Sequence, residues 1–379
     1  MQRFILMLVL LSLPVVISQS QETSDTGWEI IERCVGDPIT PPDGWTFDGT
    51  ILATGWVGIH GINADWDTPR VQLFRDDWAL FQELSPSDRW LATTRSEFAC
   101  PQCFSRVWRI SEIRVFDTLN GDEYIIPIDV GYDYGISYQT RIQMRWWDDD
   151  EIVFFTNGSS VYGRPIQSQR INPFTNERSI IELPIYPLTN DFDFHPSLNW
   201  ELAVYNPIEL PEEGQWSVYN LETGDGLLQL SSIVGSPHPT DVVAWSNASS
   251  QFITTTVSEN SKFITYYNHL SESITNIYPI AFDDTPNHIE WSHDGRYVAF
   301  VKSKLFAGGE LILIDTEHQI IYETCIETGS VHWSPVANQL ALLSRNGQSS
   351  IEIYQPEANV VYGTGIYHEG RIIGWREDS

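Results

Sequence analysis

The residues with the clearest chemical potential are tyrosines, carboxylates and histidines in short polar segments. A tyrosine ring stacks on the apolar face of a sugar, while carboxylates accept hydrogen bonds from its hydroxyls. We therefore treat seven residues as candidate ligand-binding residues, with ordinary solvated loop residues as the alternative. They are Tyr132, Asp133, Tyr134, His238, Asp283, Asp284 and His288.

Another acidic group occupies 148–151, where three aspartates precede a glutamate. An EF-hand spreads its oxygen ligands over a loop of about 12 residues with a glycine at the turn, and this segment lacks that spacing. It is either a solvated hairpin tip or a calcium site. The nine histidines show no metal-ligand spacing, and no Gly-x-Ser-x-Gly nucleophile motif occurs. We expect no catalytic residues, no metal except calcium and no cofactor.

Short β-strands that recur along the chain must position these residues. The clearest unit is HIEWSHDGRYVAFV at 288–301, in which two β-rich runs flank an Asp-Gly turn. This pattern predicts a hairpin. Two more β-rich runs, at 310–315 and 319–324, extend the hairpin into an antiparallel meander of four strands. No segment has sustained helical periodicity, so we expect few helices.

The same pattern returns at regular intervals. The first turns of the units begin at Ser85, Trp147, His195, Ser246, Ser292 and Ser334. Their spacing is 62, 48, 51, 46 and 42 residues. A four-stranded propeller blade takes about 40–50 residues, so each unit is interpreted as one blade, with one long insertion that holds Cys100 and Cys103.

The two ends of the chain supply complementary pieces. Segment 44–55 has a turn and a second strand without a first, while 371–378 has a first strand without a second. We therefore predict an all-β, seven-bladed propeller of four-stranded antiparallel blades, with its C-terminal strand paired to the N-terminal blade to close the ring. Six or eight blades would follow if the terminal pieces do not combine. The predicted domain spans 44–379, after a lead at 21–43.

The unit HIEWSHDGRYVAFVKS at 288–303 resembles the TolB-type, WD40-like propeller repeat, whose hallmark is W-S-P-D-G-[KR]-x-[IL]-A-F. Trp333-Ser334-Pro335 matches part of that run, and the segment from Leu84 to Asp88 is a looser copy. The resemblance implies a scaffold for interaction and ligand binding. It does not imply catalysis, because the matching residues belong to strands and turns. No α/β-hydrolase domain of the prolyl-oligopeptidase type accompanies the repeats.

The aromatic residues have a structural interpretation in this fold. The chain contains 15 Trp, 16 Tyr and 17 Phe. Wide wedges between blades need large side chains, so we expect packing between blades rather than ligand contact from the tryptophans near the first turns. These are Trp147, Trp245, Trp291, Trp333 and Trp375.

Four cysteines suggest disulfide chemistry in an exported chain. Cys100 and Cys103 are separated by two residues and favour a local disulfide, with a metal or redox pair and other pairings as alternatives. A zinc site would need a second close ligand pair, which is not visible. If Cys100 and Cys103 pair, Cys34 and Cys325 remain for each other.

Segment 1–20 has one arginine, an apolar run and small residues at its end, which is typical of a cleaved secretory signal peptide. A membrane anchor is the alternative, but a span needs about 20 apolar residues. The chain has 51 Asp and Glu against 21 Lys and Arg, a formal net charge of −30. Such a surface repels nucleic acid phosphates. We expect a secreted or periplasmic monomer that does not bind nucleic acid or span a membrane.

Two main functions remain open at this point, beside a third, a structural module of a larger envelope assembly. The first is a non-catalytic propeller scaffold that binds an extracellular or periplasmic protein or glycan through a face built from loops. The second is an enzyme of the polysaccharide lyase or glycosidase kind, with carboxylates at the mouth of the central channel. Facing carboxylates near the axis would favour the second.

Overall fold

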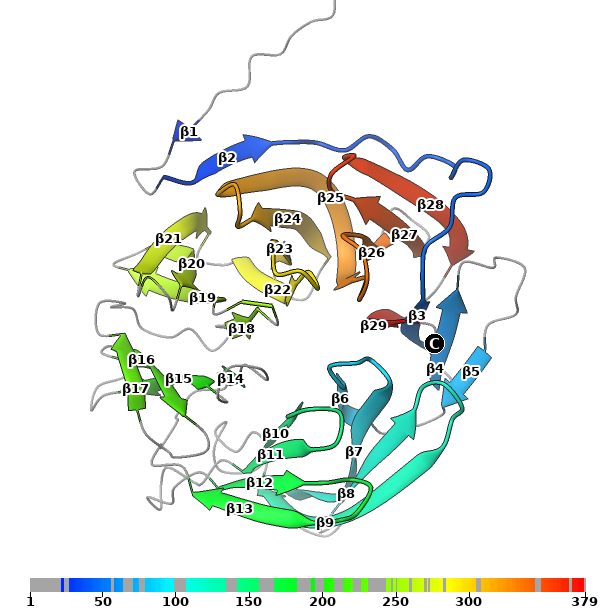
Figure 1. The fold of residues 1–379 in the computed structure, drawn as a ribbon, viewed down its shortest axis with the longest axis vertical. Coiled ribbons are helices and arrows are strands. Elements are labelled where there is room, and N and C mark those ends of the chain that lie inside the picture. The colour runs from blue at the N-terminus through cyan, green and yellow to red at the C-terminus, as the bar shows by residue number, and fades with distance from the viewer. Residues whose placement is uncertain are drawn as a thin grey trace, which may run out of the picture.

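In the computed structural model, β-sheets are arranged around a central axis (Figure 1). The structure describes residues 22–23, 27–55, 58–63, 71–74, 79–98, 107–133, 142–156, 167–182, 192–194, 201–207, 214–220, 226–230, 243–246, 248–249, 251–258, 261–268, 271, 273–281, 284–304, 308–344, 349–367 and 370–377. These residues form strands and turns and contain no helix, so none of them belongs to a helix that could cross a membrane.

Both ends of the chain contribute to one sheet, here called the terminal sheet, which is ordered β29-β3-β4-β5. Its strands are β29 (Arg371–Arg376), β3 (Thr50–Gly55), β4 (Gly58–Asn63) and β5 (Val71–Phe74). β29 and β3 are antiparallel, with Arg371 opposite Thr54 and Arg376 opposite Thr50. The predicted pairing of the last strand with the first repeat is therefore present.

Four further antiparallel sheets follow in chain order, each with its strands in sequence. The first contains β6 (Ala79–Leu84), β7 (Trp90–Phe98), β8 (Val107–Asp117) and β9 (Glu123–Asp133). The second contains β10 (Ile142–Trp146), β11 (Ile152–Thr156), β12 (Gln167–Ile171) and β13 (Arg178–Glu182). The third contains β14 (Phe192–Phe194), β15 (Glu201–Pro207), β16 (Gly214–Asn220) and β17 (Gly226–Leu230). The fourth contains β18 (Val243–Trp245), β19 (Gln251–Ser258), β20 (Ser261–Asn268) and β21 (Ser273–Ile280).

The last two meanders share the long strand β25, which was expected to be two separate strands. Its N-terminal part completes the β22–β25 meander, and its C-terminal part begins the β25–β28 meander. The strands are β22 (Asp284–Trp291), β23 (Tyr297–Lys304), β24 (Gly309–Asp315), β25 (Ile320–Trp333), β26 (Leu340–Ser344), β27 (Ser350–Gln355) and β28 (Val360–Tyr367).

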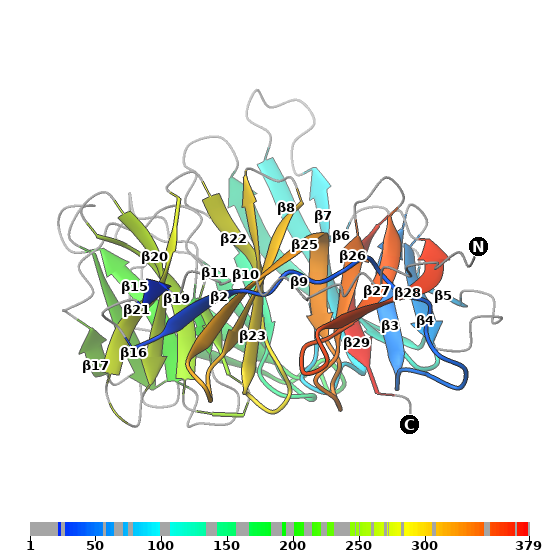
Figure 2. The same ribbon diagram turned by 90° about the horizontal axis from the view of Figure 1, so that it is seen from above.

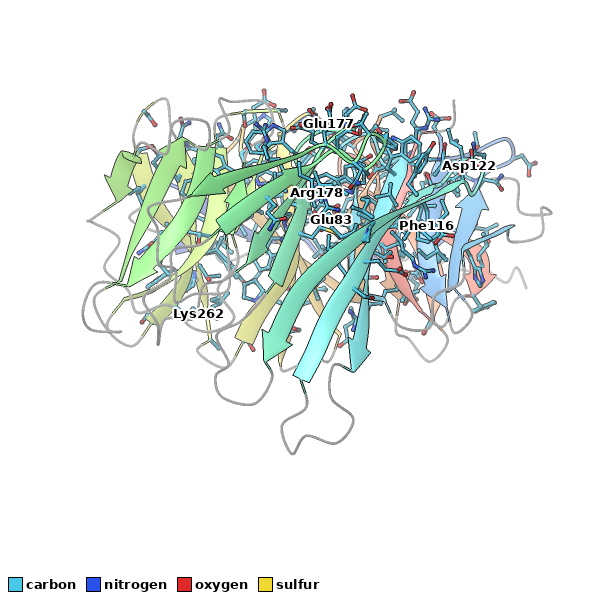
Figure 3. All side chains as sticks on the ribbon, turned by 90° about the horizontal axis from the view of Figure 1, so that it is seen from below. Glu83, Phe116, Asp122, Glu177, Arg178 and Lys262 are labelled. Carbon is cyan, nitrogen blue, oxygen red and sulfur yellow. A yellow bond between two sulfur atoms is a disulfide. The ribbon has the colours of Figure 1, made fainter. Side chains whose placement is uncertain are left out.

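The meander topology gives the molecule two different faces. We call the face with the turns between first and second strands, and between third and fourth strands, the turn face. The opposite face, with the connections between second and third strands and between sheets, is the loop face. Figure 3 shows Asp122 and Glu177 at the turn face and Lys262 toward the loop face.

The predicted Asp-Gly turn is closed by its own polar side chains. Ser292 Oγ accepts a hydrogen bond from the Tyr297 amide at 2.9 Å and donates to Asp294 at 2.6 Å. Arg296 reaches the next hairpin of its meander and pairs with Asp315 at 2.9 Å. Such local side-chain bonds satisfy backbone groups that no strand partner can reach.

The looser copy at 84–90 uses the same scheme. Ser85 Oγ accepts from the Trp90 amide at 3.2 Å, and Arg89 pairs with Asp117 at 3.0 Å. The two turns therefore share one hydrogen-bonding pattern although their sequences differ, which explains why a repeat can be recognised from so few residues.

Indole groups connect neighbouring sheets through the innermost strands. Trp291 Nε1 donates to the Ala244 carbonyl at 2.9 Å, and Trp333 Nε1 donates to the Glu290 carbonyl at 3.0 Å. Both rings are buried, as expected for packing between blades. In the β10–β13 sheet, Trp146 makes the equivalent bond.

Trp147 and Trp375 have different contacts from Trp291 and Trp333. The Arg170 guanidinium lies 3.7 Å from the Trp147 ring centroid, within the β10–β13 sheet. Trp375 Nε1 donates to the Asp48 carbonyl at 2.8 Å. Asp48 lies just before β3, the strand that pairs with β29.

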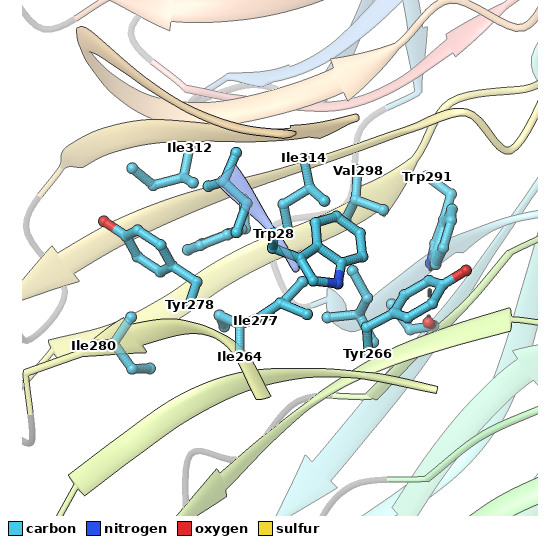
Figure 4. Packing of buried hydrophobic residues seen from close by; sticks show 14 residues of the cluster. Trp28, Ile264, Tyr266, Ile277, Tyr278, Ile280, Trp291, Val298, Ile312 and Ile314 are labelled. Carbon is cyan, nitrogen blue, oxygen red and sulfur yellow. Dashed lines mark hydrogen bonds between the residues drawn. The ribbon is translucent and has the colours of Figure 1, made fainter. Parts of the chain in front are cut away.

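The N-terminal lead lies along the outside of two meanders (Figure 2). It contains β1 (Glu22–Thr23) and β2 (Glu29–Glu32), and β2 adds to the outer edge of β25 in parallel. Farther along, Ile39 forms a bridge with Tyr362 in β28. Trp28 is buried among residues from the β18–β21 and β22–β25 strands (Figure 4). The lead is thus packed against the propeller strands.

A disulfide between Cys34 and Cys325 fixes this lead to β25. Cys325 has φ 58°, in the left-handed region, at a bulge of the β24–β25 pair. Gly365 has φ 70° at the corresponding bulge of the β27–β28 pair. Cysteine therefore replaces glycine at the bulge next to the lead. Cys100 and Cys103 lie outside the described residues, so their predicted disulfide stays a prediction.

Candidate functional site

The strongest cluster of functional groups lies where innermost strands meet. We call the residue two positions before each first-turn residue the junction position. The tryptophan after it donates from its indole to the innermost strand of the preceding sheet, as Trp146 and Trp333 do. The junction side chains themselves bond between neighbouring innermost strands. The described junction side chains include Glu83, Arg145, Glu290 and His332.

Two junction pairs carry opposite charges. Arg145 Nη1 lies 3.1 Å from Glu83 Oε2, between β10 and β6. His332 Nδ1 lies 2.9 Å from Glu290 Oε1, between β25 and β22. The other Glu290 oxygen accepts a hydrogen bond from the Trp333 amide at 3.2 Å. Glu290 is consequently fixed by two groups of the next meander.

Gly374 occupies the junction position of β29 and leaves room for its neighbour. A Cβ atom at residue 374 would overlap Leu84 Cδ1 and would lie 3.9 Å from Asp88 Oδ1. Asp88 belongs to the turn between β6 and β7 and has φ 57°, a backbone conformation that aspartate tolerates better than most residues. The missing side chain thus leaves room for Leu84, and the Asp88 carboxyl group lies nearby.

The surroundings of Asp88 favour its protonated form. Burial raises its pKa to about 8, and repulsion from Glu290 and Asp149 adds to the effect, while His332 and Arg376 oppose it. A neutral carboxyl group can donate a hydrogen bond, which a carboxylate cannot.

The neighbours of His332 favour its charged form. Burial acts to lower its pKa, but the Glu290 charge, the hydrogen bond to Glu290, the Asp88 charge and a bond to the Ile372 backbone outweigh burial and raise it. A histidine whose two nitrogens both face acceptors must donate from both, which requires the imidazolium form.

Together, Asp88 from the β6–β7 turn, Glu290 from β22 and His332 from β25 bring two carboxyl groups and an imidazole into one electrostatic cluster. This set can hold hydroxyl groups of a ligand, or protonate one group while a carboxylate acts on another. The sequence analysis missed all three. Comparing the junction positions of the aligned repeats would have shown that ionisable residues, Glu290 and His332 among them, recur there.

The seven predicted ligand-binding residues do not form a described cluster. Tyr132 and Asp133 end β9, in register with Trp108 and Val107, so they continue a hairpin strand instead of starting the expected loop. Asp284 and His288 lie in β22, which was also expected to begin later. Tyr134, His238 and Asp283 are outside the described residues.

Asp284 is the one predicted ligand-binding residue whose side-chain burial the structure describes. It is 8% exposed, and its carbonyl accepts a hydrogen bond from buried Lys262 at 3.4 Å. The side chain is therefore largely withdrawn from solvent, because the ladder with β23 begins at this residue.

The acidic segment 148–151 is part of a hydrogen-bonded turn. Asp148 Oδ1 accepts from the amides of Asp150 and Glu151, both at 2.8 Å. Asp149 accepts from the Ser87 amide of the neighbouring sheet at 3.1 Å. Asp148 and Asp149 are therefore engaged in hydrogen bonds to backbone amides of the turns.

Within the described ranges, one group of three residues has the spacing of a metal site: Glu32, Cys34 and Cys325. Its two sulfur atoms form the disulfide, so they offer no thiolates to a cation in this state.

No family model and no curated protein matches the sequence. Among solved structures, the Swd1 β-propeller domain of Myceliophteria thermophila is similar with a TM-score of 0.51 and 13% identity, covering 89% of this chain and 99% of that one. An uncharacterized protein of Listeria monocytogenes has a TM-score of 0.51 and 11% identity, covering 88% and 95%. TolB of Acinetobacter baumannii has a TM-score of 0.44 and 13% identity, covering 87% and 82%. The first two similarities, with the repeated antiparallel meanders, show that this chain has the WD40-like β-propeller fold that its repeats predicted.

Proposed function

We propose that the chain is an exported propeller scaffold that binds a protein or a glycan through its loop face. Segment 1–20 acts as the signal peptide in this proposal, and the partner is extracellular or periplasmic. The disulfide between Cys34 and Cys325 supports export, because such bonds persist in oxidising compartments.

The observation that carries the proposal is that polar side chains on the turn face form hydrogen bonds and ion pairs within their own turns and meanders. Ser292, Asp294 and Arg296 bond within their own meander, and Asp148 bonds to its own turn. Side chains engaged in this way close hairpins and offer few free groups to a partner. Recognition is therefore assigned to the loop face, where we place the seven predicted ligand-binding residues.

A binding screen of the secreted protein against glycans and extracellular proteins tests this proposal. Substituting Tyr132, Tyr134, His238 and His288 with alanine should reduce binding to the selected partner at least about tenfold, a loss of about 1.4 kcal/mol. Glu177→Gln, at an exposed turn-face residue, is the matched control and should bind normally. Equal binding by both variants would refute the loop-face assignment.

The residues at the junctions support a second candidate function. Glycoside hydrolysis uses one protonated and one ionised carboxyl group, and Asp88 and Glu290 could supply them. Incubation with a polysaccharide panel and detection of new reducing ends separates the two functions. An enzyme would lose turnover in both Asp88→Asn and Glu290→Gln, whereas a scaffold would produce no new ends at all.

We also propose that the sheets form seven blades in one closed ring. The terminal sheet, the four sheets from β6 to β21 and the two meanders that share β25 are the seven units in this interpretation. The pairing of β29 with β3 supports closure through the two ends of the chain. We expect the protein to be a monomer, because a closed ring leaves no blade face unpaired.

A further inference from the structure

The lead is joined to β25 at an exposed point where two sulfur atoms and a carboxylate come together. Cys34 and Cys325 form the disulfide there, with their Cα atoms 4.8 Å apart. Glu32 Oε1 lies 3.4 Å from Cys34 Sγ. The ligand atoms of all three residues lie within 4.8 Å of one another, and all three residues are exposed. An ion in solution can therefore reach this group directly.

Backbone hydrogen bonds on both sides of Cys34 hold this group in place independently of the disulfide. Immediately before it, the Arg33 amide donates to the Glu323 carbonyl at 2.8 Å. Immediately after it, the Val35 amide donates to the Thr324 carbonyl at 3.0 Å. The whole of β2 is also paired with β25 in a parallel ladder. The two sulfur atoms therefore remain neighbours when the bond between them is broken.

The lead has further anchors at each end. Trp28 is 4% exposed and packs among buried residues of the β18–β21 and β22–β25 strands. At the other end, the Ile39 amide donates to the Val361 carbonyl of β28 at 2.9 Å. Reduction of the disulfide thus leaves the lead on the propeller and does not separate its two cysteines.

Reduction converts the disulfide into a pair of soft metal ligands. An external dithiol supplies two electrons and two protons, which break the sulfur–sulfur bond and leave two thiols, while the reagent itself becomes a disulfide. A zinc ion then displaces both thiol protons and binds the thiolates. The Glu32 carboxylate adds an oxygen ligand. Because all three ligands are anionic, the reduced group suits a dication.

The separation of the ligand atoms suits a tetrahedral zinc centre. Zinc–sulfur bonds of about 2.3 Å and zinc–oxygen bonds of about 2.1 Å place a sulfur and an oxygen ligand about 3.6 Å apart. The distance between Glu32 Oε1 and Cys34 Sγ is 3.4 Å. Three protein ligands leave the fourth position to water, as in open zinc sites.

We propose that the reduced chain binds a zinc ion through Cys34, Cys325 and Glu32, so that the metal replaces the disulfide as the link between the lead and β25. The lead is then fastened in either redox state. A covalent bond joins it to β25 in oxidising conditions, and a metal bridge joins it in reducing conditions.

Zinc titration of the full protein tests this site in a background that carries Cys100→Ser and Cys103→Ser, which removes the other two cysteines. The protein is reduced with a dithiol, which is then removed by anaerobic gel filtration. Competition with a chromophoric chelator should show one zinc ion bound per reduced chain and none per oxidised chain. Zinc should also raise the melting temperature of the reduced protein alone, because a ligand that binds only the folded state stabilises it.

Glu32→Gln keeps both thiols and removes the carboxylate. Its affinity for zinc should fall at least about tenfold, since loss of an outer-shell partner already costs about 10–100-fold. Asp37→Asn is the matched control, because Asp37 is an exposed carboxylate of the same lead outside the three-residue group. It should bind zinc as the parent does. Equal affinities of Glu32→Gln and the parent would refute the carboxylate ligand.

Cys325→Gly tests the thiolates and keeps the backbone conformation, because glycine adopts φ 58° without penalty. This variant should lose the bound zinc ion. Zinc binding that is equal in Cys325→Gly and the parent, or in the oxidised and reduced proteins, would overturn the proposal. A reduced protein that binds no zinc would overturn it as well, and so would a loss of β-structure on reduction, seen by circular dichroism, that zinc does not reverse.

Discussion

One carboxylate holds two hairpins together in the best-formed repeat. Asp315 is 2% exposed and accepts hydrogen bonds from Arg296 at 2.9 Å and from the His318 amide at 3.1 Å. Burial alone would raise its pKa, but these bonds and the Arg296 charge outweigh burial and lower it. The Asp117–Arg89 pair repeats the arrangement in the β6–β9 sheet.

Asp315→Asn should therefore destabilise the protein by about 1–3 kcal/mol at pH 7, the range for hydrogen bonds to a charged group. A group with a lowered pKa stabilises above its unfolded value and loses that effect as pH falls through the folded one. The difference between parent and variant should consequently shrink below pH 4. Denaturant unfolding at pH 7 and pH 3 measures it, and a constant difference would contradict this account.

At the residue scale, the sequence predicted structural roles better than site roles. Trp291 and Trp333 pack between sheets as predicted. Each stands at the same position of its repeat, so each meets the innermost strand of the preceding sheet. Asp88 and His332 could not be identified as partners, since they meet only when β6, β25 and β29 are brought together in space. Such contacts depend on how strands far apart in the sequence assemble, and they leave no local pattern.

At the element scale, the indole bonds between innermost strands determine how neighbouring sheets are oriented. Trp291→Phe should remove the bond to the Ala244 carbonyl and leave that buried acceptor unpaired, at a cost of about 1–3 kcal/mol. Trp90→Phe is the control, because Trp90 packs against Tyr124 and Phe174 through its ring. A thermal melt should show the larger loss for Trp291→Phe, and equal losses would contradict the role of the indole bond.

The bulge at Cys325 gives a second prediction at this scale. Cys325→Gly and Cys325→Ala both remove the disulfide with Cys34, but only glycine adopts φ 58° without penalty. Removing a native disulfide costs about 2–5 kcal/mol. The alanine variant should be less stable than the glycine variant by about 1–2 kcal/mol, the penalty for a left-handed residue with a side chain. Denaturant midpoints compare them, and equal stability would show that the backbone relaxes at this bulge.

At the scale of the whole molecule, the repeats predicted the antiparallel meanders and the contact between the two chain ends. The lead at 21–43 was placed outside the predicted propeller domain, yet β2 adds to β25. Sequence analysis could not place it, because a single short strand gains its stability from the edge that it joins. The net charge of −30 remains compatible with any partner that is not itself strongly acidic.

The central claim is that the last strand completes the first sheet and thereby closes one ring, and removal of β29 tests it most directly. A chain that ends at Gly370 should lose its cooperative thermal transition or unfold at a much lower temperature than the full protein, because β3 then has no inner partner. Adding a peptide of sequence RIIGWRED should restore part of that stability. A truncated protein with the melting temperature of the full chain would contradict the closed ring.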